Sequence, residues 1–143
     1  MSERRKALQA YCAKYIPVLR MIAEDEELTE ACLDHDLLAY EKKHRSVIRY
    51  LHRELIREAM EENLFPGETT ELVRGNAIEE WVAHPEETAL MDLDADHVAG
   101  CIAWHFHRDP LSFMEFIRET VGKGYLLRMM EVLRIKLEEE SAV

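Results

Sequence analysis

Apolar residues recur at intervals of three and four along most of this chain, and this spacing predicts amphipathic helices. The first predicted helix covers residues 7–23, where Pro17 is expected to kink it or to start its second half. A long helical stretch follows at 28–64, with a break expected in the polar run 41–44. The sequence Phe65-Pro66-Gly67 then ends this stretch.

Capping residues divide the second half of the chain. Asp92 or Asp94 is expected to cap a helix that ends at His107, and Asp109 followed by Pro110 is expected to start another. The helical ranges predicted beyond residue 67 are about 70–83, a short turn at 86–91, a segment ending at 107, a segment from 110 to 122 or 124, and 125–139.

The pattern as a whole favours an all-α fold, a single-domain bundle of five or six helices spanning residues 1–143. Strand-like alternation is missing, and glycine and proline are few. Most of the core is predicted from residues 47–60, 98–106 and 126–137. The last helix is apolar at nine of the thirteen positions 125–137, without a polar face. Such a helix is expected to be central in the bundle or to bury a second face in a homodimer.

The formal net charge of −11 is unevenly distributed along the chain. Residues 1–20 carry net +4, residues 21–41 net −8, residues 42–57 net +5 and residues 58–97 net −11. Duplex phosphates repel a protein of this overall charge, so nucleic acid is not expected as a partner. The three cysteines form no Cys-x-x-Cys pair, and no uncharged run is long enough to span a membrane. These features favour a soluble protein of the reducing cytoplasm.

Arginines stand every fourth residue at Arg45, Arg49, Arg53 and Arg57. On a helix they form a slowly winding stripe, in which like charges at i,i+4 repel by roughly 0.2–0.5 kcal/mol per pair. Something must offset this repulsion, and three hypotheses are considered: pairing with acids of the same chain, docking of an acidic protein or second subunit, or binding of nucleic acid or phosphate. Overall acidity disfavours the third. On a helix, Arg45 and Arg57 lie about 120° apart, so the four arginines are not expected to meet one flat partner together. If any of them serve function, a neighbouring pair is expected, and Arg49 with Arg53 is the first choice.

The acids considered for pairing with this stripe are Glu24 to Glu27, Glu61, Glu62, Glu79 and Glu80, and the additional basic groups beside it are Lys42, Lys43, His44 and His52.

One cluster has the residue types of a metal site. His97, Cys101 and His105 are spaced i, i+4 and i+8, and imidazole and thiolate are good ligands for Zn²⁺. The alternative is a buried thiol and a core histidine beside an apolar helix face. The rise of about 12 Å from His97 to His105 prevents one ion from binding both end histidines of a straight helix. No metal or other cofactor is therefore expected, and these three residues are the candidates if one is bound.

The C-terminal third carries a family resemblance. Residues 101–110 read Cys-Ile-Ala-Trp-His-Phe-His-Arg-Asp-Pro, and residues 122–133 read Gly-Lys-Gly-Tyr-Leu-Leu-Arg-Met-Met-Glu-Val-Leu. This region resembles a family of small bacterial proteins known only as a domain of unknown function, matching it at Arg108, Asp109, Gly124, Leu127 and Arg128. The resemblance implies a small helical domain and brings no activity with it.

No phosphate-binding glycine loop, nucleophile elbow or zinc-protease helix occurs in the chain. The sequence therefore favours a non-catalytic intracellular interaction or regulatory module, with a protein partner or self-association through the C-terminal helix. Two alternatives stay open. One is a metal-dependent helical protein using the cluster above, and the other is an acidic nucleic-acid mimic that places the acids of 58–97 on one surface.

Overall fold

The computed structural model describes residues 2–34, 36–73, 90–107 and 113–141, and the regular elements in these ranges are all helical. The all-α prediction is confirmed. The α-helices are α1 (Glu3–Glu24), α2 (Glu26–Leu33), α3 (Lys42–Tyr50), α4 (Arg57–Glu61), α7 (Ala95–His107), α8 (Phe113–Phe116) and α9 (Tyr125–Ser141). Two 3-10 helices, η1 (Leu37–Ala39) and η3 (Gly67–Leu72), and two π-helical segments, η2 (Leu51–Ile56) and η4 (Ile117–Val121), complete the described elements.

The described ranges hold seven α-helices rather than the expected five or six. The difference arises mainly in the stretch 28–64, which η1 interrupts and which a π-helical segment divides into α3 and α4. The expected break near 41–44 is found just before Lys42, where α3 begins. The first residues of the helix predicted at 70–83 belong to the 3-10 helix η3, which ends at Leu72. Most of the rest of that predicted helix, most of the turn predicted at 86–91 and the Asp109-Pro110 boundary lie outside the described residues.

Side-chain caps explain several helix boundaries. The hydroxyl of Ser2 accepts a hydrogen bond from the backbone N–H of Arg5 at 3.2 Å and starts α1. Asp25 ends α1 and also caps α2, because its carboxylate accepts the backbone N–H of Leu28 at 3.0 Å. Between these caps α1 runs on through Pro17 as one helix.

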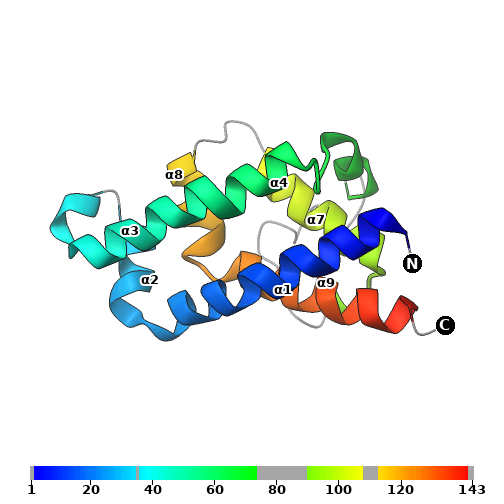
Figure 1. Cartoon of the computed structure of the whole chain (residues 1–143), viewed down its shortest axis with the longest axis horizontal. Helices are drawn as coiled ribbons and strands as arrows, with labels where there is room; N and C mark the ends of the chain where they lie inside the picture. Colours follow the sequence, from blue (N-terminus) through cyan, green and yellow to red (C-terminus); the bar gives the residue numbers. More distant parts are fainter. Residues whose placement is uncertain (1, 35, 74–89, 108–112, 142–143) are drawn as a thin grey trace.

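The centre of the molecule is built from α1, α7 and α9. Figure 1 shows α1 and α9 side by side and antiparallel, with both chain ends at the same end of the bundle. Each predicted core segment buries one face, but the three together supply less of the core than expected, because other helices contribute as well. The residues that α1 adds are Leu8, Tyr11, Cys12, Tyr15, Ile16, Leu19 and Ile22. Met60, which was expected in the core, is exposed because it lies beyond the buried face of its helix.

The apolar character of α9 follows from its position. This helix packs against α1 and also against α7, so two of its sides are covered within one chain. Its buried residues are Leu126, Met129, Met130, Val132, Leu133 and Leu137. The central position that the sequence offered as one alternative is therefore the one observed. No helix of the described residues is long and apolar enough to cross a membrane.

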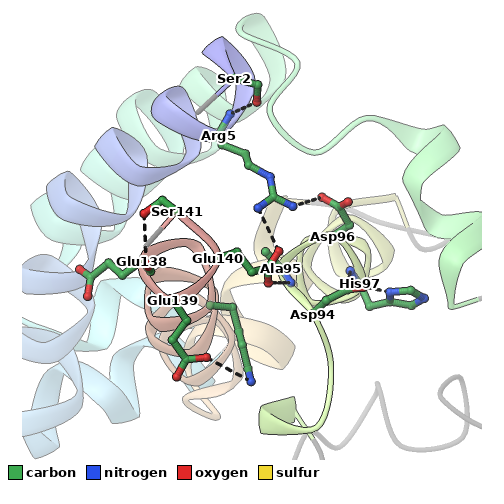
Figure 2. Close-up of polar contacts among 11 residues, drawn as sticks. Ser2, Arg5, Asp94, Ala95, Asp96, His97, Glu138, Glu139, Glu140 and Ser141 are labelled. Atoms are coloured by element: carbon green, nitrogen blue, oxygen red, sulfur yellow. Dashed lines mark hydrogen bonds and ion pairs between the residues drawn. The ribbon is translucent and has the colours of Figure 1, made fainter. Parts of the chain in front are cut away.

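A polar clasp joins the ends of α1, α7 and α9 (Figure 2). The guanidinium of Arg5 donates to Glu140 Oε1 at 2.9 Å and to Asp96 Oδ1 at 3.2 Å. The other oxygen of Glu140 accepts the backbone N–H of Ala95 at 2.8 Å, while Asp94 accepts that of His97 at 2.8 Å. Two carboxylates thus cap the N-terminus of α7, as predicted for Asp94 and not for Glu140.

Candidate functional site

The four arginines at positions 45, 49, 53 and 57 lie on one continuous helical rod, which is formed by α3, the π-helical segment η2 and α4 (Figure 1). The backbone stays right-handed helical at both junctions, so the rod is not broken there. His44, Ile48, Leu51, Leu55 and Ala59 are buried and attach the rod to the bundle. Arg45 is half-buried, and the other three arginines are exposed.

The π-helical segment changes the course of the arginine stripe. A step of four residues overshoots one α-helical turn by about 40°. The i→i+5 hydrogen bonds of a π-helix widen the turn to more than four residues. The steps from Arg49 to Arg53 and from Arg53 to Arg57 cross residues Leu51–Ile56, so they drift less than on a uniform α-helix. The stripe is therefore straighter than the 120° expected from the sequence, and we call it the arginine face.

Self-pairing occurs at one end of the arginine face. Arg57 Nε lies 2.7 Å from Glu61 Oε1, and this hydrogen bond, assisted by the charge of Glu61, raises the pKa of Arg57. The side chains of Arg45, Arg49 and Arg53 make no ion pair or hydrogen bond with any described residue. The expected pairing with Glu24 to Glu27 and Glu62 is absent from the described contacts, and Glu79 and Glu80 lie outside the described residues.

Four glutamates, Glu54, Glu58, Glu61 and Glu62, line a shallow groove together with Arg53 and Arg57. Of these, the Glu58 carboxylate is held by α1. Its Oε1 accepts hydrogen bonds from Lys14 Nζ and from the Tyr15 hydroxyl, both at 2.8 Å. Partial burial opposes ionisation of Glu58, but these two hydrogen bonds and the charge of Lys14 prevail and lower its pKa. Packing of α1 against the rod therefore removes an acid that could have paired with the arginines.

The alternative metal ligands His97, Cys101 and His105 are not arranged as a metal site in the described part of the chain. The described residues contain no group of three or more His, Cys, Asp and Glu side chains placed to hold a metal ion. His97 is bound to Asp94, with Nδ1 2.7 Å from Oδ1. His105 is buried, and its Nδ1 lies 3.2 Å from Thr120 Oγ1. Burial raises the pKa of the Cys101 thiol to about 12, so it stays protonated at neutral pH and is a poor ligand.

The acidic surface expected over 58–97 lies partly outside the described residues, so the nucleic-acid-mimic alternative stays a prediction. Comparison of the chain with family models, with curated proteins and with solved structures finds no match. The resemblance to a domain of unknown function likewise stays a prediction. Function is therefore inferred from the geometry of the residues themselves.

Proposed function

We propose that this protein is a non-catalytic interaction module whose arginine face binds an acidic segment of a partner protein. The observation that carries the proposal is the lack of ion pairs at three of the arginines. Arg45, Arg49 and Arg53 have no carboxylate partner within the described residues, although the chain contains 29 acids. A protein with so many acids could have neutralised its arginines internally at little cost.

The chemistry of arginine favours a carboxylate-bearing partner. Its planar guanidinium forms paired hydrogen bonds to carboxylates, and it loses less hydration than lysine when an interface forms. The buried side of the rod holds the backbone of the face in place before binding, which reduces the ordering cost of association. Screening limits repulsion from the distant acids to about 8–10 Å at physiological ionic strength, so a local basic face can act within an acidic protein.

Self-association through α9 is the second partner that the sequence suggested. Since α1 and α7 cover α9 on two sides, Ile135 is the large apolar side chain of this helix that remains exposed. We therefore favour the arginine face. The cytoplasm is the compartment we propose, because Cys12, Cys32 and Cys101 are buried free thiols, as in proteins that fold under reducing conditions.

The test uses a defined acidic chain. Fluorescein-labelled poly-L-glutamate is titrated with the protein at low ionic strength, and anisotropy reports binding. The double variant Arg49→Gln/Arg53→Gln is expected to bind about tenfold more weakly, which corresponds to about 1.4 kcal/mol. The matched control is Arg4→Gln/Lys6→Gln, which removes two exposed positive charges from α1 and is expected to bind within about twofold of the unmodified protein.

Two outcomes would refute binding at this face, and a third would reassign the face to another class of partner. One is an equal loss in the control, which would mean that net charge alone governs binding. The other is the absence of saturable binding by the unmodified protein. Tighter binding of a duplex DNA of matched charge would assign the face to nucleic acid instead of protein.

A further inference from the structure

The junction of α1 and α2 concentrates negative charge. Five carboxylates from Glu24, Asp25, Glu26, Glu27 and Glu30 line one open hollow at this turn. None of them pairs with a described lysine or arginine. Residues 21–41 contain eight acids and no Lys or Arg, so the sequence itself places no cation there. Such a surface raises the local concentration of cations, but an acidic cluster alone does not define a site.

A second observation comes from α3. The side chain of His44 is only 3% exposed and reaches the acidic turn from the neighbouring helix. Its Nδ1 lies 3.5 Å from Glu27 Oε1, and its Nε2 lies 3.9 Å from Asp25 Oδ2. Nδ1 is buried and has no hydrogen-bond partner within the described residues. A buried polar atom without a partner is costly, so its position against a carboxylate requires an explanation.

We propose that His44 Nδ1 and the Glu27 carboxylate bind one divalent transition-metal cation, for which Zn²⁺ is the reference. The separation of 3.5 Å between their two atoms is long for a hydrogen bond, which spans about 2.7–3.2 Å. Two ligands that each lie about 2.0–2.1 Å from a tetrahedral Zn²⁺ are roughly 3.4 Å apart. The observed spacing therefore suits an ion between the two groups.

The opposite edge of the imidazole supports the same assignment. Histidines that bind a metal through one nitrogen usually donate the N–H of the other to a carboxylate, which fixes the tautomer. Asp25 Oδ2 lies 3.9 Å from Nε2, too far for a direct hydrogen bond, so its carboxylate favours the Nε2–H tautomer through its charge, while its other oxygen caps α2 through Leu28. In this arrangement the imidazole is neutral, its Nδ1 lone pair faces the cation, and Nε2–H points to Asp25.

The donor set also defines the class of cation. Imidazole nitrogen with carboxylate oxygen suits Zn²⁺ and neighbouring transition metals, whereas Ca²⁺ and Mg²⁺ prefer oxygen ligands alone. Glu27 is 53% exposed, which leaves a path for a hydrated ion to enter. The remaining ligands are water, since no third protein ligand is in place among the described residues. A bound ion would join the α1–α2 turn to the first turn of α3, whose N-cap residue Glu41 makes no side-chain cap.

The test is isothermal titration of the full, tag-free chain with ZnCl₂. Glu27→Gln and His44→Gln are each expected to weaken Zn²⁺ binding at least tenfold. The matched control is Glu26→Gln, which removes the same charge from the same hollow without a contact to His44, and it is expected to bind within about twofold of the unmodified protein. A large excess of MgCl₂ is expected not to displace the Zn²⁺.

The proposal is overturned if Glu26→Gln loses as much affinity as Glu27→Gln, because binding would then reflect diffuse charge. It is equally overturned if His44→Gln binds as the unmodified protein does, or if the unmodified protein shows no saturable binding. Circular dichroism checks the fold of His44→Gln. Should that variant unfold, Glu27→Gln decides, because its exposed side chain can be replaced without disturbing the core.

Discussion

Replacing Glu140 by alanine is expected to destabilise the protein by about 1.5–2 kcal/mol, although this residue lies three positions from the end of the chain. The change removes two hydrogen bonds. The bond from the Ala95 backbone N–H satisfies an otherwise unpaired donor at the start of α7, and loss of such a cap costs about 1 kcal/mol. The ion pair with Arg5 is only partly shielded from water, with side chains 26% and 31% exposed, so it adds about 0.5–1 kcal/mol.

Thermal unfolding followed by circular dichroism measures the effect. For a chain of this size the estimate corresponds to a fall in Tm of about 5–10 °C. Glu139→Ala is the matched control, because Glu139 is the preceding residue of α9 and its contact with Lys136 is long, at 3.6 Å, and exposed. This control is expected to stay within about 0.5 kcal/mol of the unmodified protein.

A double-mutant cycle separates the two contributions. Arg5→Ala removes the ion pair with Glu140 and the more exposed one with Asp96 but leaves the cap, so it is expected to cost about 0.5–1 kcal/mol. The double variant with Glu140→Ala should cost less than the sum. High salt should reduce the Arg5 effect and spare the cap. A Glu140→Ala variant indistinguishable from Glu139→Ala would refute the assignment of the clasp as a stabilising contact between α1, α7 and α9.

Three further substitutions or conditions test the packing. Gly100→Ala would place its Cβ 2.9 Å from the backbone oxygen of Thr69, so η3 and α7 must separate, and urea unfolding should show a loss of about 1–3 kcal/mol. Tyr11→Phe leaves the Leu55 carbonyl without the buried hydroxyl that donates to it at 2.7 Å, and calorimetry should record a loss of about 1–2 kcal/mol. Burial raises the pKa of all three cysteine thiols from 9.0 to about 12. The contribution of the buried neutral thiols to stability is therefore complete below pH 9.0 and is lost as the pH rises from 9.0 towards 12. Labelling with a thiol reagent over an alkaline pH series will follow this loss. Rapid labelling of the native protein at about pH 8 would contradict the prediction.

The candidate site was visible in the sequence only in part. The four-residue spacing of the arginines and their place on a helix could be predicted, because helical periodicity is a local property. Their pairing could not, since it depends on which acids other helices bring near and on which of those acids are already bound, as Glu58 is by Lys14. His44 and Glu27 lie 17 positions apart and share no motif. The only signal was a histidine at the start of a basic segment that follows an acidic one.

The alternative metal site shows how little the spacing of residues alone can establish. His97, Cys101 and His105 have the spacing of ligands on one helix, but spacing says nothing of the environment. In the folded protein Cys101 lies in the apolar core, His97 is hydrogen-bonded to Asp94, and His105 lies within hydrogen-bond distance of Thr120. The same local pattern can therefore be a binding site or part of the packing, and the neighbours decide which.

The sequence by itself determined the all-α class of this protein, the cap at Asp94 as one of two candidates, and the segregation of charge along the chain. These depend on residues within a turn or two of each other, where periodicity and capping chemistry act. Only the tertiary structure decided that α9 is central, that Arg5 meets Glu140 across 135 positions, and which charged groups remain without partners. Those outcomes depend on contacts between distant segments, whose geometry is set when the whole core packs at once.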